Sequence, residues 1–353
     1  MSFLFSLFEW ITYVGLSVLL GNMVLQYIPQ SKKPTIKLSK RWLIASAIAI
    51  AIFSVGTMLE IVIAFSKIRG VGETLTTVLL STKTGHAWIM IVLLAILVIL
   101  TVILDSHHHI YTSLTIGLVL AISYASHAAS LSPLFGMLSH SLHVISVGLW
   151  AGVVLIVAFF TRQADNWSVF LKWFTPFAIS CFLFLSLSGL IVMVIIVGLA
   201  NYVNAWATDY GQSLLLKHIT IIPLLAFAVI NGILMKKVSN QSDYHPLSWI
   251  KAESATLLMI FFFTAVMVNQ SPPTDLSHLG ASSLLPFIYG QSVSLPLTFN
   301  LTIVSIIFLF IALLFFVYVF INFYKKTNAW IGFLSSGLFV FAFYVAMILS
   351  IQF

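Results

Sequence analysis

The sequence predicts an all-α polytopic membrane protein, with about ten transmembrane helices in one bundle. Of its 353 residues, 61% are hydrophobic and only 7% are charged, and the mean hydropathy is +1.11. Soluble globular domains contain about 25% charged residues, so this composition excludes that class. Apolar runs of about twenty residues recur along the chain, and each is long enough to cross a hydrocarbon core of about 30 Å. We therefore expect residues 1–353 to form a single transmembrane domain.

The positions of these apolar runs predict ten helices. A basic segment separates the first two, and only a few residues around Asp105 join the third and fourth, which makes them an antiparallel hairpin. The fifth begins after Ser132 and Pro133, which are typical of a helix N-cap and first turn. Before the ninth helix comes a proline-containing segment, too long for a simple turn, which we expect to form a lid or a short interfacial helix. The ten ranges are roughly 3–28, 42–66, 86–104, 110–127, 134–161, 174–200, 213–235, 252–270, 297–324 and 330–351.

The basic residues predict the orientation of the helices. When the connections alternate between the two sides, one side receives 12 of the 16 lysines and arginines, and the other receives Lys67, Arg69, Lys83 and Lys217. This bias predicts that the richer side is cytoplasmic and that both termini are extracytoplasmic. The formal charge of +7 comes from these short connections, so it does not indicate nucleic-acid binding.

Three histidines lie in a stretch that is otherwise typical of a membrane span, SHAASLSPLFGMLSHSLHVISVGLWAG. His127 ends the fourth expected helix, and His140 and His143 open the fifth. Positions three apart lie about 60° apart on one helix face, and Trp150 returns to that face. Such polar residues can simply meet the water boundary or a backbone carbonyl, but ionisable residues within a membrane are costly and mark functional candidates. The pattern favours a metal site.

Two further histidines fall on the same predicted outer side. His86 begins the third expected helix, and His218 lies about a turn and a half into the seventh. A random scatter of polar residues would not place five imidazoles so consistently at one side. The expected metal ligands are therefore His127, His143, His140, His218 and His86. Their expected core is His127, His143 and one of His140 or His218.

Carboxylates near the expected helices are few, and each suggests a partner because a buried carboxylate is expensive. Glu9 and Glu60 lie toward the outer ends of the first two helices, and Glu60 could complete the metal site or carry a proton. Met58 is about 200° round the helix from Glu60, so these two cannot both face one site. Lys217 could instead form a salt bridge with Glu60 or Glu9, and this alternative stays open. The accessory candidates are Glu60, Met137, Met58, Lys217 and Glu9.

The remaining histidines stand apart from this set. His107, His108 and His109 occupy the short inner turn after Asp105, where they could receive a metal leaving the membrane. His278 lies in an outer loop and could help to capture an ion. Short polar turns are commonly just solvated, so both alternatives stay open for these residues.

Copper is the metal that this set of residues favours. Neutral imidazole suits copper, zinc, nickel and iron, whereas thioether favours Cu(I). The sequence contains no P-loop, HExxH or CxxC motif, so we expect neither ATP-driven pumping nor enzymatic activity. Haem b is the alternative cofactor, since histidines facing each other across helices could ligate haem and make the chain an electron carrier. A third alternative is a metal-delivery or assembly factor without transport.

The stretch SHAASLSPLFGMLSHSLHVISVGLWAGVVL resembles the hallmark of the bacterial copper resistance protein D (CopD) family. In that family an HA dipeptide precedes an H-x6-W-x-G pattern. Here His127 and Ala128 match the dipeptide, and His143, Trp150 and Gly152 match the pattern.

Three further stretches agree with the same family. GQSLLLKHITIIPLLAFAVIN resembles its G-x2-L-L-x-K helix, Glu253 resembles the acidic residue that opens the next helix, and VNQSPPT matches the PP that follows. The G-x2-L-L-x-K pattern is matched by Gly211, Leu214, Leu215 and Lys217. The resemblance covers roughly residues 80–275, and the flanking helices in 1–66 and 297–351 carry less of the pattern.

The resemblance implies a multi-pass protein of the bacterial inner membrane that brings copper toward the cytoplasm, as Cu(I) or Cu(II). It also implies a small extracytoplasmic copper-binding protein of the CopC type as a partner. The expected function is therefore that of a copper permease, with an outer histidine site.

Overall fold

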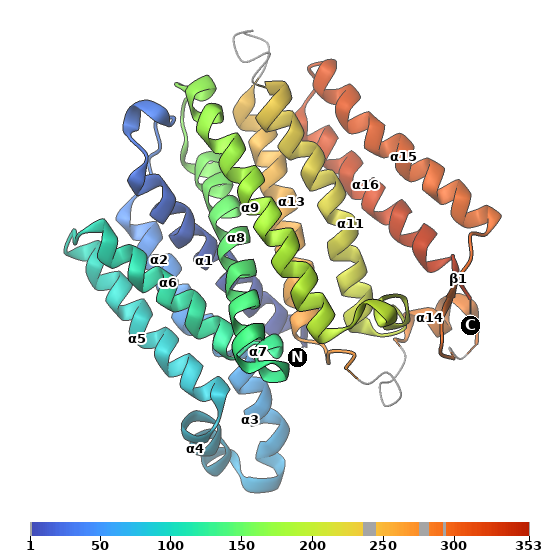
Figure 1. Ribbon diagram of the computed structural model, residues 1–353, viewed down its shortest axis with the longest axis horizontal. Coiled ribbons are helices and arrows are strands. Elements are labelled where there is room, and N and C mark those ends of the chain that lie inside the picture. Colours follow the sequence, from blue (N-terminus) through green and yellow to red (C-terminus); the bar gives the residue numbers. More distant parts are fainter. Residues whose placement is uncertain (1, 236–244, 275–281, 292–293, 353) are drawn as a thin grey trace. The chain divides into compact units, whose positions relative to one another are not determined.

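The computed structural model describes residues 2–235, 245–274, 282–291 and 294–352, and within them the chain is helical almost throughout (Figure 1). It confirms the predicted all-α membrane class. The chain divides into two compact units, 1–196 and 197–353, and Gly198 turns it just after the division with a φ of 76°. The sequence predicted a single domain, because no motif in it marks this division. Lys236 and Lys237, two of the twelve basic residues on the predicted cytoplasmic side, and His278 lie outside the described residues.

The first unit contains nine α-helices and a 3-10 turn within its described residues. Helices α1 and α8 pack against each other, α2 and α6 both pack against α5, and α9 packs against α8 (Figure 1). The bounds are α1 Ser2–Tyr27, η1 Gln30–Lys32, α2 Lys40–Phe53, α3 Gly56–Arg69, α4 Val71–Ser81, α5 Lys83–Ile103, α6 His108–Tyr124, α7 His127–Leu131, α8 Pro133–Phe160 and α9 Trp167–Ile196.

The second unit is built on the helices α11, α13, α15 and α16, in which α15 and α16 form a hairpin. Two short antiparallel strands close that hairpin, because Thr298 pairs with Gln352 and Phe299 with Ile351. The bounds are η2 Leu199–Asn201, α10 Tyr202–Ala205, α11 Asp209–Val229, the π-helix η3 Ile230–Leu234, α13 Pro246–Val268, α14 Leu284–Tyr289, β1 Thr298–Phe299, α15 Ile303–Tyr324, α16 Ala329–Ile348 and β2 Ile351–Gln352.

Each of the ten predicted ranges contains a helix. Among the described residues, nine helices are long and apolar enough to cross a membrane, and the tenth, α6, has only 17 residues. At 1.5 Å per residue α6 is about 25 Å long, and it packs along α5 as the predicted hairpin requires. The chain is therefore a multi-pass membrane protein.

Some predicted boundaries are wrong. The range 42–66 is interrupted, because α2 ends at Phe53 and α3 begins at Gly56. The range 297–324 begins six residues late, at Ile303, because Thr298 and Phe299 form β1 and the Thr302 side chain caps α15. Helix α4 was not predicted, and its eleven residues lie against α3 and α5 (Figure 1).

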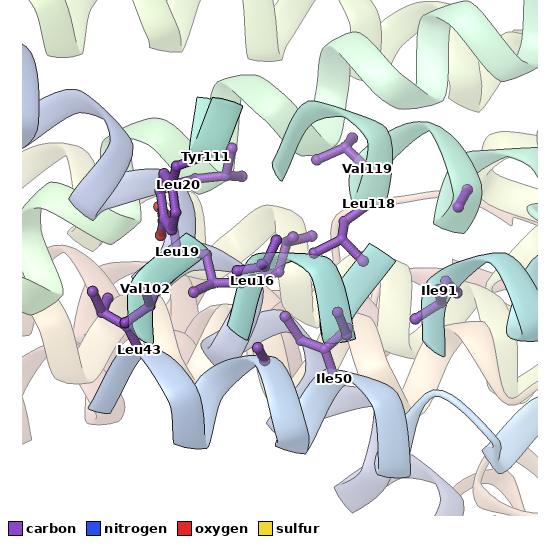
Figure 2. Packing of buried hydrophobic residues seen from close by; sticks show 14 residues of the cluster. Leu16, Leu19, Leu20, Leu43, Ile50, Ile91, Val102, Tyr111, Leu118 and Val119 are labelled. Carbon is purple, nitrogen blue, oxygen red and sulfur yellow. Dashed lines mark hydrogen bonds between the residues drawn. The ribbon is translucent and has the colours of Figure 1, made fainter. Parts of the chain in front are cut away.

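A buried apolar cluster holds α1, α2, α5 and α6 of the first unit together (Figure 2). Leu16 and Leu19 of α1 lie among side chains from α2, α5 and α6, and Leu19 is fully buried. The Tyr111 hydroxyl of α6 donates a 3.0 Å hydrogen bond to the backbone oxygen of Leu19. This bond satisfies the hydroxyl in an apolar setting and fixes α6 to α1.

Helices α1 and α8 cross at a point where neither has a side chain. A Cβ added to Gly152 of α8 would lie 1.9 Å from the Ser17 carbonyl oxygen, and one added to Gly21 of α1 would lie 2.2 Å from the Gly152 carbonyl carbon. Small residues allow membrane helices to pack backbone to backbone, which gains dispersion energy that lipid cannot match. The glycine of the H-x6-W-x-G pattern therefore has a packing role.

The connection between α1 and α2 is tied to the end of α8. The backbone N–H of Lys37 donates to the Phe160 carbonyl, and Ile36 forms an isolated β-bridge with Thr161. The Thr35 N–H and hydroxyl both donate to the Asp165 carboxylate, at 2.9 and 2.7 Å, which holds the pKa of that carboxyl below its usual value. These bonds fix the end of the unit that the basic residues predict to be cytoplasmic.

Candidate metal centre

A tight corner between α7 and α8 positions His127. The Ser126 side chain caps α7 by accepting from the Ala129 N–H at 3.2 Å, so His127 is the first residue of that helix. Helix α8 then begins at Pro133, as predicted. A Cβ added to Gly136 would lie 2.0 Å from the Ala128 carbonyl oxygen, so α7 lies directly on the first turn of α8. Because positions four apart share a helix face, this brings the start of α7 to within about one turn of His140.

His140 is oriented by α6. Its Nδ1 forms a 3.0 Å hydrogen bond with the Ser123 hydroxyl, in the last turn of α6. Ser123 is fully buried, whereas His140 is half-buried. Such a bond at Nδ1 fixes the ring plane and is the arrangement that usually supports an imidazole ligand.

His143 lies in the interface between α8 and α9. A Cβ added to Gly189 of α9 would lie 3.0 Å from its Cε1 and 3.1 Å from its Nδ1, so the absence of a side chain at Gly189 makes room for the ring. Seven residues further, Trp150 is buried and meets Phe182 of α9 edge to face, with ring centroids 6.3 Å apart. The tryptophan of the pattern therefore fixes the same two helices whose interface holds the histidine.

These contacts define what we call the α7–α8–α9 corner, consisting of His127, His140, His143 and Gly189 together with Ser123 of α6. All of these residues belong to the first unit. The sequence predicted the three histidines but not Ser123 or Gly189, because Ser123 belongs to α6 and Gly189 to α9, and only the packing of these helices on α8 brings them to His140 and His143.

His86 has a backbone partner that the sequence did not indicate. Its Nε2 forms a 2.8 Å hydrogen bond with the Leu80 carbonyl, near the end of α4. The ring is exposed, so this contact corresponds to the alternative in which a histidine satisfies a carbonyl. Its place among the metal ligands stays a prediction.

The two methionine candidates differ in their surroundings. Met58 is buried, 3% exposed, in an apolar cluster with Val62 and Val78. In this setting Met58 contributes to apolar packing. Met137 is half-buried and lies three residues before His140 on α8, so it remains the methionine better placed for the corner.

The predicted outer carboxylates lie on adjacent helices. The Thr57 hydroxyl of α3 donates a 3.2 Å hydrogen bond to Glu9 Oε1 of α1. Glu60 follows Thr57 by three residues, so it lies on the same face of α3. Two carboxyl groups therefore face the α1–α3 interface, which is a setting that can carry a proton or a cation.

The remaining predicted residues belong to the second unit. The His218 Nδ1 forms a 2.7 Å hydrogen bond with the Tyr202 hydroxyl, and the two rings stack at 5.6 Å. Lys217 precedes it on α11. The meeting of His218 with the first-unit histidines, and the salt bridge of Lys217 with Glu9 or Glu60, stay predictions.

A buried polar pair also lies in the second unit. The Asn231 Nδ2 donates to Glu253 Oε2 at 2.7 Å and to the Trp249 carbonyl at 3.2 Å. Asn231 is 5% exposed and Glu253 2%, so this acidic residue of α13 is held inside the helix packing.

Within the described part of the chain, one group brings three ligating side chains together as the structure stands. It consists of His107, His108 and His109, in which one ligand atom from each lies within 4.8 Å of the others. The histidines of the α7–α8–α9 corner, all of them among the described residues, do not form such a group of three.

Comparison with known families gives two matches. Residues 1–137 match the family model described as Copper resistance protein D-like, N-terminal domain, and residues 168–267 match the model described as Copper resistance protein D. Together the two matches cover more than half of the chain, and the first includes the helices before residue 66, where the sequence motifs had indicated less of the pattern. His140 and His143 fall between the two matches. No curated protein and no solved structure matches the chain.

Proposed function

We propose that this chain, which belongs to the copper resistance protein D family, is a copper permease that binds the ion at the α7–α8–α9 corner. Membership in the family makes it a copper resistance protein of a membrane. The finer proposal is that the ion enters from the extracytoplasmic side of the bacterial inner membrane and passes toward the cytoplasm. The proposed activity is transport of the ion and not the catalysis of a reaction.

The observation that carries this proposal is the way in which three separate helices hold the histidines of the corner. Ser123 of α6 orients His140, Gly189 of α9 leaves space for His143, and α7, which begins at His127, packs on α8 at Gly136, one turn before His140. Ionisable residues within a membrane are costly and mark functional candidates, and three half-buried imidazoles lie in this corner. Packing alone would be satisfied by apolar side chains.

The chemistry of these donors suits copper. Imidazole nitrogen binds late first-row metals, with Cu(II) the most tightly bound of the divalent ions, and a thioether such as that of Met137 favours Cu(I). Because the chain has no nucleotide-binding motif, the ion would move down its gradient, with the membrane potential, or in exchange for protons at Glu9 and Glu60. A CopC-type protein on the outer side would supply the ion to the corner.

The test is copper uptake by proteoliposomes that contain the purified chain, with His143→Ala compared with the wild type. Loss of the ring that Gly189 accommodates is expected to reduce the uptake rate at least tenfold, since loss of even an indirect ligand partner typically costs a site 10–100-fold. His245→Ala is the matched control, because His245 is an exposed histidine at the start of α13 and is expected to have no effect.

Three results would contradict the permease proposal. Equal copper uptake by His143→Ala and the wild type would show that copper does not pass through the α7–α8–α9 corner. Copper binding without any uptake by the wild type would favour the metal-delivery alternative, and a Soret absorption band in the purified protein would favour haem.

A further inference from the structure

The turn between α5 and α6 gathers three imidazole rings at one place. The centroids of His107 and His108 are 4.3 Å apart, those of His108 and His109 4.2 Å, and those of His107 and His109 4.8 Å. One nitrogen from each ring lies within 4.8 Å of the other two. In a tetrahedral metal site with bonds of about 2.0 Å, neighbouring ligand nitrogens are about 3.3 Å apart. Small side-chain rotations would therefore close these rings around an ion.

Tyr27, the last residue of α1, holds two of the three rings. Its hydroxyl forms hydrogen bonds with His109 Nδ1 at 2.9 Å and with the Thr112 hydroxyl at 3.1 Å. Its ring meets His108 edge to face, with centroids 4.8 Å apart. A partner at Nδ1 assigns Nε2 of His109 as the ligating nitrogen, which is the usual arrangement for histidine in metal sites.

His107 has a second role that metal binding would interrupt. It is the N-cap residue of α6, and its Nδ1 accepts from the His109 N–H at 3.4 Å. If Nε2 bound a metal, Nδ1 would carry the proton and this bond would be lost. The bond is long, so the loss is small.

The charges around the turn are compatible with a cation. Asp105, two residues before His107 in the chain, pairs with Lys40 at 2.5 Å, so these two charges offset each other. The N-terminus of α6 carries a partial positive charge that opposes a cation, but this effect is screened at an exposed position. His107 and His109 are exposed, so an ion held here is accessible to a soluble acceptor.

We propose that His107, His108 and His109 form a second copper site, at the opposite end of α6 from the α7–α8–α9 corner. The other end of α6 carries Ser123, the partner of His140, so one helix of about 25 Å connects the two sites. We further assign the triplet as the place where copper leaves the protein, and this part of the inference rests on the proposed function. The metal site itself rests only on the triplet and Tyr27.

The test is a titration of the purified full-length chain with Cu(I) against a chromophoric competitor, which gives the number and affinity of the bound ions. The variant H107N/H108A/H109A removes the three rings but keeps a good N-cap, since asparagine is favoured at that position. It is expected to bind one copper ion fewer than the wild type. His245→Ala, which removes one exposed histidine elsewhere, is expected to leave the count unchanged.

Tyr27→Phe provides a milder variant that removes a single oxygen atom. Loss of the bond to His109 Nδ1 is expected to weaken this one site about 10–100-fold without changing the number of sites. Wild-type stoichiometry and affinity in the triplet variant would overturn the inference. Loss of an ion there, with no change in His143→Ala, would leave the inference intact and contradict the proposed corner site.

Discussion

Replacing Asn231 by leucine is expected to lower the free energy of unfolding by about 3 kcal/mol. Asn231 donates a 2.7 Å hydrogen bond to the carboxyl oxygen of Glu253, and both side chains are buried. Leaving a buried polar group without its hydrogen-bond partner costs about 1–3 kcal/mol, because the group loses water on folding and gains no bond in return. Asn231 lies in the π-helix η3, a distortion that is common at functional sites. The measurement is thermal unfolding of the purified protein in detergent.

The matched control removes both partners. In N231L/E253M two apolar side chains of similar volume replace the polar pair, so the buried carboxyl is removed together with its amide donor. This double variant is expected to unfold much closer to the wild type than Asn231→Leu alone. Equal destabilisation of the single and the double variant would contradict the interpretation that the carboxyl depends on Asn231.

Replacing Gly152 by alanine is expected to be at least as damaging. The added Cβ would lie 1.9 Å from the backbone oxygen of Ser17, and a backbone atom cannot move away by changing a rotamer. Overpacking usually costs about 1–3 kcal/mol. Here it would separate α1 from α8, and each of these helices packs more extensively against the other than against any other helix. We expect a large loss of folded protein and a lower unfolding temperature.

Gly337→Ala is the control for this substitution. Gly337 lies inside α16, and an added Cβ there would meet nothing within 4 Å. Alanine also has a higher helix propensity than glycine, so this variant is expected to be neutral or slightly stabilising. If Gly152→Ala behaved like Gly337→Ala, close packing of α1 on α8 would not be required.

The sequence was sufficient for the membrane class and for all ten long helical segments, because apolar length is a signal that each segment carries by itself. It was not sufficient for α4. This helix has eleven residues, begins next to Gly70 and is too short to span a membrane, so no length criterion marks it. The strands β1 and β2 were also missed, since the pairing of Thr298 with Gln352 depends on the α15–α16 hairpin.

The histidine positions were only partly predictable. A spacing of three placed His140 and His143 on one helix, but their partners Ser123 and Gly189 come from other helices and depend on packing. From the sequence, the triplet at the α5–α6 turn was more readily interpreted as a solvated turn, and a metal site was the less favoured alternative. Only the fold brings Tyr27, 82 residues away along the chain, to His109.

The most direct test of the corner site is X-ray absorption spectroscopy of copper bound to H107N/H108A/H109A, in which the triplet cannot compete for the ion. We predict that this variant retains copper with a shell of imidazole nitrogens, and that adding His143→Ala removes or weakens that signal. A protein that binds no copper in this background, or binds it without imidazole, would contradict the proposal that the α7–α8–α9 corner is the copper site.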